Sequence, residues 1–171
     1  MTVDRSPARL SGTVAVGAAV VSVLASGLYS WPALLIGSAS VVLISVGLLS
    51  GSRSKPTGGA TGLCVAALVA GVQGAPTIFV LVGATAAIIA WDATTTAISV
   101  GAQLGRAANT RRIEAIHLTA SVGVGTATAG SAYLIFETAT ANQPLSALVL
   151  LVVAAVLVLT TIQHNADVTS R

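Results

Sequence analysis

The sequence has few charged residues and only one cysteine. Just 8% of its 171 residues are Asp, Glu, Lys or Arg, against about 25% in an average soluble domain. So few charges exclude a disordered chain, a soluble enzyme and a nucleic-acid binder, which needs a clustered basic face. The single cysteine, Cys64, excludes an intrachain disulfide and a thiolate metal cluster. Because 54% of the residues are hydrophobic, the sequence indicates an all-α membrane protein within a lipid bilayer.

Two uncharged runs are too long for one membrane crossing each. The 43 residues of 10–52 would form roughly 65 Å of helix, about twice the ~30 Å hydrocarbon core. We expect a break at 29–32, since proline fits the first turn of a helix and aromatic side chains favour the headgroup level. The run 56–91 is also too long for one crossing, and we expect its break at 74–76.

Two further apolar runs complete a prediction of six transmembrane helices arranged as three hairpins. Segment 1–10 precedes them, a tail at 164–171 follows them, and a polar cytoplasmic connector at 92–112 joins the fourth span to the fifth. This connector either prolongs the fourth helix or lies at the membrane interface. A cleaved signal peptide ending near Ala25 is an alternative for the N-terminus. The expected spans are 11–29, 33–50, 58–73, 76–91, 113–136 and 145–163.

All the lysines and arginines fall in alternate connections of this six-span topology. Positive residues of short loops stay in the cytoplasm, so the sequence predicts a multi-pass protein of the cell membrane with cytoplasmic N and C termini. The partition needs the third span, without which the cluster at 106–112 would lie outside. The positive residues are Arg5, Arg9, Arg53, Lys55, Arg106, Arg111, Arg112 and Arg171.

Small residues recur at every fourth position in the third and fifth expected spans. Such stripes let helix backbones approach closely, so we expect these two helices to lie inside the bundle. Homo-oligomerisation through one stripe is the alternative. The stripes are Gly58, Gly62, Ala66, Ala70 and Gly74, and Ala115, Thr119, Gly123, Ala127 and Ser131.

Ionisable residues gather in and beside the connector. Glu114 and His117 are three residues apart and therefore share a helix face, whereas no Asp, Glu, Lys or Arg lies at the centre of an expected span. That pattern argues against a proton relay of buried carboxylates. The simple interpretation is a set of charges at helix ends; the sharper one is a docking surface for partners. The candidate docking residues are Asp92, Gln103, Arg106, Arg111, Arg112, Glu114 and His117.

No catalytic motif is present, such as a phosphate-binding glycine loop, HExxH or GxSxG. We therefore expect no enzymatic activity and no cofactor. Glu114 and His117 are too few to hold a metal ion without a third ligand.

The connector and its flanks resemble an uncharacterised family of small polytopic membrane proteins from halophilic archaea. The resemblance implies a helical membrane protein without an established activity, encoded near a MoxR-type ATPase and a von Willebrand-like protein. It also implies a membrane subunit of an assembly or chaperone system. The residues that carry it are Trp91, Asp92, the run 101–106, the run 110–112, Glu114, His117, Gln143 and Pro144.

Two functions follow from these features. The first is a non-enzymatic membrane scaffold or accessory subunit that presents its basic connector to membrane or cytoplasmic protein partners. The alternative is a small-solute transporter or channel with a pathway along the glycine-rich third and fifth helices.

Overall fold

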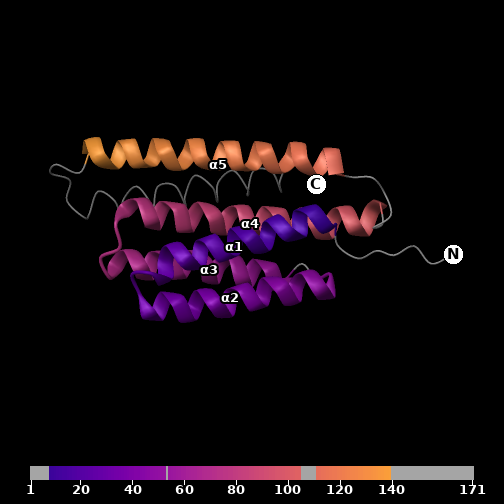
Figure 1. The fold of residues 1–171 in the computed structure, drawn as a ribbon, viewed down its shortest axis with the longest axis horizontal. Coiled ribbons are helices and arrows are strands. Elements are labelled where there is room, and N and C mark those ends of the chain that lie inside the picture. The colour runs from indigo at the N-terminus through magenta and orange to yellow at the C-terminus, as the bar shows by residue number, and fades with distance from the viewer. Residues whose placement is uncertain (1–7, 53, 105–110, 140–171) are drawn as a thin grey trace, which may run out of the picture. The chain divides into compact units, whose positions relative to one another are not determined.

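The computed structural model describes residues 8–52, 54–104 and 111–139, and its regular structure in these ranges is entirely helical (Figure 1). This confirms the all-α class for the described chain. The residues divide into two units, Met1–Tyr133 and Leu134–Arg171. The described part of the second unit, 134–139, is the end of one helix, so the packing of the described helices lies within the first unit. The helices are α1 Arg9–Gly27, α2 Trp31–Ser50, α3 Ser54–Val72, α4 Thr77–Leu104 and α5 Arg111–Ala139.

Short turns separate the first four helices where proline and glycine predict breaks. Ser30 caps α2 by accepting a 3.1 Å hydrogen bond from the Ala33 N–H, and Pro32 occupies the first turn. Gly51 ends α2 with φ 62°, and Gly74 follows α3 with φ 92°. Both values lie in the left-handed region that favours glycine. The predicted breaks at 29–32 and 74–76 are therefore confirmed, while the third expected hairpin turn, before Pro144, lies outside the described residues.

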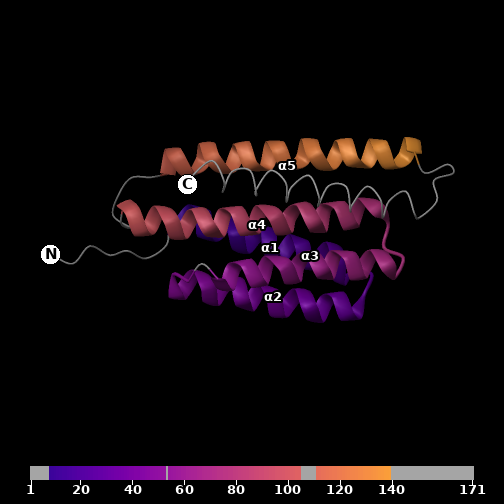
Figure 2. The ribbon, with the colours of Figure 1, turned by 180° about the vertical axis from the view of Figure 1, so that it is seen from behind.

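Helices that follow one another in the chain run antiparallel. The Ala8 N–H donates to the Ala97 carbonyl at 3.0 Å, and Ser22 Oγ donates to the Gly83 carbonyl at 2.8 Å. These bonds join α1 to α4 in opposite directions. In the two opposite views, α2 lies along α3 (Figures 1 and 2). Chain direction therefore alternates from α1 to α4.

Glycine permits the closest approach between α2 and α3. A Cβ atom on Gly59 would come within 2.7 Å of Ile44 Cγ1 and 2.9 Å of the Ser40 carbonyl oxygen. A Cβ atom on Gly62 would come even closer to the Ser40 hydroxyl, and Ala66 and Ala70 pack against Ala33. The predicted stripe on this helix is correct at its middle members, but a Cβ atom on Gly58 or Gly74 would meet nothing within 4 Å.

The predicted stripe on α5 is wrong, since its members from Ala115 to Ser131 are exposed. The buried side chains of α5 are Glu114 and Leu118, and Leu118 packs with Ala15 of α1 and Ala93 of α4. The face of α5 that packs therefore begins one residue earlier than the stripe. The physical reason is that contacts with α1 and α4, and not small size alone, select the buried face.

Large apolar side chains point outward, while the interior is built mainly from alanine. Only Ile44 and Leu63 are large members of the main core cluster. By contrast, Leu28, Leu49 and Val72 are 72%, 88% and 89% exposed. A soluble domain rarely exposes so much apolar surface, whereas small interior residues and an apolar exterior suit helices packed in lipid.

Three of the described helices are long and apolar enough to cross a membrane: Leu10–Gly27, Trp31–Ser50 and Thr77–Ala102. The helices α3 and α5 are as long, but their mean hydropathy is lower because they contain more small and polar residues. The expected sixth span, 145–163, lies outside the described residues. The structure is thus compatible with a membrane protein but does not support six spans.

The fourth helix is longer than the sequence predicts. It continues through Asp92 to Leu104, so residues 92–104 of the connector prolong it, which is one of the two arrangements that the residues leave open. The apolar window of this helix also includes Asp92, which the sequence places just beyond its end.

Candidate functional site

Three polar side chains meet between α4 and α5. Asp92 Oδ2 accepts a 2.6 Å hydrogen bond from Ser121 Oγ and lies 2.9 Å from His117 Nε2. His117 and Ser121 are one helical turn apart on α5, so both reach the same carboxylate. We call Asp92, His117 and Ser121 the polar triplet.

The triplet defines the orientation of the histidine ring. A carboxylate accepts hydrogen bonds from an imidazole N–H, so the contact between Asp92 Oδ2 and His117 Nε2 is a hydrogen bond in the tautomer that carries its hydrogen on Nε2. Thr96 Oγ1, one turn along α4 from Asp92, lies 3.1 Å from the same nitrogen. The side chains of His117 and Asp92 are 43% and 30% exposed, so the pair is open to small molecules.

The triplet lines a cavity of about 480 Å³. Its other walls are aliphatic and aromatic side chains with two threonines. A site of this volume is large enough for a small organic molecule. The lining residues are Thr85, Ile88, Ile89, Trp91, Asp92, His117, Ala120, Ser121, Val124, Gly125 and Thr128.

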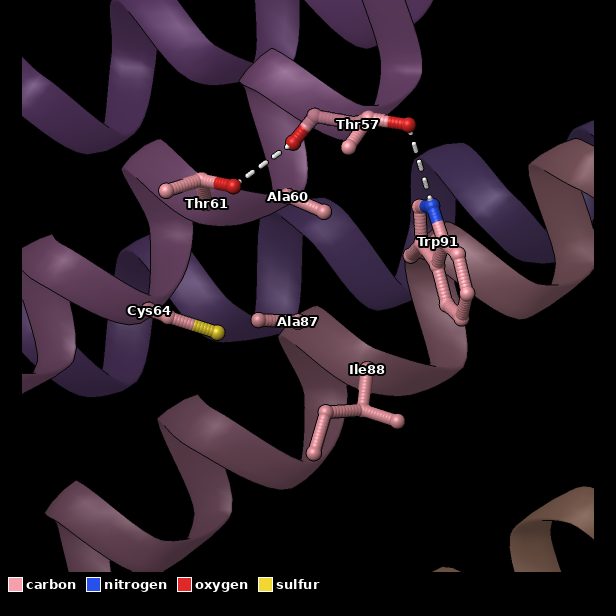
Figure 3. Close-up of a pocket in the computed structure, with 7 residues that line it drawn as sticks. All are labelled: Thr57, Ala60, Thr61, Cys64, Ala87, Ile88 and Trp91. Carbon is pink, nitrogen blue, oxygen red and sulfur yellow. Dashed lines mark hydrogen bonds between the residues drawn. The ribbon is translucent and has the colours of Figure 1, made fainter. Parts of the chain in front are cut away.

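A second cavity, of about 260 Å³, lies between α3 and α4 (Figure 3). Trp91 and Ile88 line both cavities. The indole Nε1 of Trp91 donates a long, 3.4 Å hydrogen bond to Thr57 Oγ1 in the first turn of α3 (Figure 3). Cys64 points toward Ala87 in this smaller, mainly apolar space, which is also lined by Thr57 and Thr61.

Glu114 is a buried carboxylate that joins α5 to the start of α1. Its side chain is 2% exposed, and Oε2 accepts hydrogen bonds from Ser11 N at 2.9 Å and Ser11 Oγ at 2.8 Å. The residue before α1 is Ala8, which has no side chain that could cap the helix. Glu114 therefore supplies, from another helix, a hydrogen-bond acceptor for a free N–H of the first turn.

A family model describes nearly all of this chain, matching residues 5–159. The chain belongs to the DUF7519 family. This family is one of unknown function, so membership assigns no activity to the cavity. No curated protein and no solved structure matches the chain. The expected resemblance to an uncharacterised family is consistent with this membership, and an archaeal origin stays a prediction.

In this DUF7519 chain, the predicted docking residues separate into three groups. Asp92 and His117 contact each other, while Glu114 binds α1 and not the pair. Arg112 is exposed in the first turn of α5. The side chains of Gln103, Arg106 and Arg111 lie outside the described residues, and docking itself stays a prediction.

Sequence reasoning missed Ser121, Thr96 and Ser11. Ser121 is four residues after His117, a spacing that signals a shared helix face. Thr96 stands in the same relation to Asp92. No sequence signal links Ser11 to Glu114, because their contact depends on how two distant helices pack. Within the described residues, no group of three His, Cys, Asp or Glu side chains could hold a metal ion.

Proposed function

We propose that this protein is a multi-pass membrane scaffold or accessory subunit that presents a basic segment, 106–112, to cytoplasmic partners. The observation that carries the proposal is the position of the cationic residues. Arg9, Lys55 and the pair Arg111 and Arg112 each fall in the first turn of a helix. Their helices α1, α3 and α5 start at one end of the described bundle, as the pairs Ser11–Glu114 and Thr57–Trp91 indicate.

Helix electrostatics cannot account for this arrangement. The N-terminus of a helix carries a partial positive charge, so a cation there is unfavourable by about 0.3–1 kcal/mol. Three helices nevertheless begin with cations, and a shared cytoplasmic location explains why. The same topology leaves the expected six crossings with both chain ends in the cytoplasm.

Aromatic residues lie near both ends of the bundle. At the turn before α2, Tyr29 packs on Phe79 with ring centroids 4.9 Å apart, and Trp31 is 69% exposed. Trp91 lies level with the first turn of α3. The window Leu10–Gly27 has 18 residues, or about 27 Å of helix, close to the ~30 Å hydrocarbon core. Aromatic residues at both ends, separated by about the thickness of the hydrocarbon core, support a membrane location.

The partner class follows from the basic segment and from the resemblance described above. Clustered arginines bind carboxylates in a bidentate manner, so the partner surface is expected to be acidic. A MoxR-type ATPase is the partner that the resemblance implies. The end of α4 extends to Leu104, beyond the point where Ala97 meets the start of α1.

A pull-down from native membranes tests the scaffold proposal. Replacing Arg106, Arg111 and Arg112 by Ala should remove co-purifying proteins that the unchanged chain retains. The matched control replaces the same arginines by Lys, which keeps the charges that set the topology but loses bidentate binding. Full retention of every partner by the alanine variant would contradict the proposal.

A second candidate function, small-solute transport, is supported by the cavity at the polar triplet. A carboxylate at membrane depth is costly and marks a substrate pathway in many transporters, and the apolar window of α4 includes Asp92. Transport predicts solute flux in proteoliposomes that contain this protein alone.

A further inference from the structure

We propose that the cavity at the polar triplet binds a small organic cation, with the Asp92 carboxylate as counter-ion to its ammonium group. This names a ligand class for the transport candidate and rests on that candidate only in using the same cavity. Binding does not require transport, so the two ideas can fail separately.

The first step is the incomplete pairing of the carboxylate. Both hydrogen bonds that reach Asp92 end on Oδ2, from Ser121 and His117. Within the described residues, Oδ1 accepts none, and the side chain is partly exposed. One carboxylate oxygen is therefore available to a ligand while the other is fixed in position by α5.

The second step is the charge of the cavity. Among the described residues that line it, Asp92 is the one acid and no lysine or arginine is present. His117 is the one other ionisable side chain among these residues. The cavity therefore favours a cation, and its low-polarity walls strengthen the attraction relative to water.

The third step separates organic from inorganic cations. A hard metal ion takes six or more oxygen ligands, whereas this cavity has one free carboxylate oxygen and a few hydroxyl groups. Apart from its polar side chains, the cavity is lined by Trp91 and by small or aliphatic residues: Ile88, Ile89, Ala120, Val124 and Gly125. Aliphatic walls match the carbon groups of an alkylammonium ion, and tryptophan is the aromatic residue that attracts such cations most strongly.

Isothermal titration calorimetry of the full chain in lipid nanodiscs tests the site with two probes of the same shape. Choline carries a quaternary ammonium, and 3,3-dimethyl-1-butanol replaces its nitrogen by carbon. We expect saturable choline binding that is about 10- to 100-fold tighter than binding of the neutral probe, because one charge-assisted contact differs.

The variant Asp92→Asn keeps the shape of the side chain and removes its charge, so choline binding should weaken by about 10-fold or more. The control Glu137→Gln removes an exposed carboxylate that does not line the cavity and should leave choline affinity unchanged.

Equal affinities for the two probes, no choline binding, or undiminished binding by a folded Asp92→Asn protein would each overturn the inference. If the variant does not fold, the comparison of probes on the unchanged chain still decides. Choline binding without flux in proteoliposomes keeps the inference and defeats transport. Flux of another solute without choline binding supports transport and overturns the inference.

Discussion

Glu114 connects α5 to the first turn of α1 through hydrogen bonds from Ser11 to its carboxyl group, which is almost completely buried. Asp92 performs a similar task between α4 and α5 with a partly exposed side chain. From the sequence, both residues are expected near helix ends, where interfacial charges are typical, but α4 continues through Asp92 to Leu104. Their different exposure separates their roles: Glu114 is positioned to stabilise the bundle, and Asp92 is positioned to meet a ligand.

Replacing Glu114 by Ala should lower the free energy of unfolding by about 1–3 kcal/mol, because it leaves the buried donors of Ser11 without this acceptor. Thermal or denaturant unfolding in detergent measures the change. Glu137→Ala, at an exposed position on the same helix, should shift the midpoint far less. Equal midpoints for the two variants would show that the Glu114 contact contributes nothing to stability.

At the level of elements, α3 shows how finely packing depends on register. Gly58 and Gly59 are adjacent, yet only Gly59 faces α2. The sequence indicates that α3 packs through small residues, and this is correct. Which of two neighbouring glycines makes the contact depends on the rotation of the helix, which a repeat of every fourth residue does not define.

Gly59→Ala should destabilise the protein by about 1–3 kcal/mol, since the new methyl group would overlap Ile44 and the Ser40 backbone. Gly58→Ala meets no neighbour within 4 Å and should be neutral or stabilise the helix by up to about 1 kcal/mol. Comparing the unfolding midpoints of the two variants tests the register of α3 against α2. A larger loss from Gly58→Ala would mean that α3 is rotated differently.

At the level of the whole molecule, the number of crossings decides on which side the basic segment lies. Three described helices qualify as spans by length and composition, and α3 and α5 alternate in direction with them. Six crossings keep all cationic ends together. An odd number of crossings between Arg53 and Arg111 would place these residues on opposite sides.

Cysteine accessibility tests this topology in a Cys64→Ala background. We expect Asn109→Cys to react with a membrane-impermeant thiol reagent only from the cytoplasmic side, and Thr140→Cys only from the outer side. In whole cells only Thr140→Cys should react, and in inverted vesicles only Asn109→Cys should react. Reaction of both cysteines on one side would contradict the proposed fifth crossing.

The sequence by itself determined the helical class, the breaks at 29–32 and 74–76, and the composition of an interior made from small residues. These features depend on local chemistry: the length of uncharged runs, the fixed φ of proline and the conformational freedom of glycine. Only the tertiary structure decided that Glu114 meets Ser11, that Asp92 meets His117 and Ser121, and which face of α5 is buried. Those contacts join residues far apart in the chain, and they depend on the rotation and depth of packed helices, which local sequence patterns leave undefined.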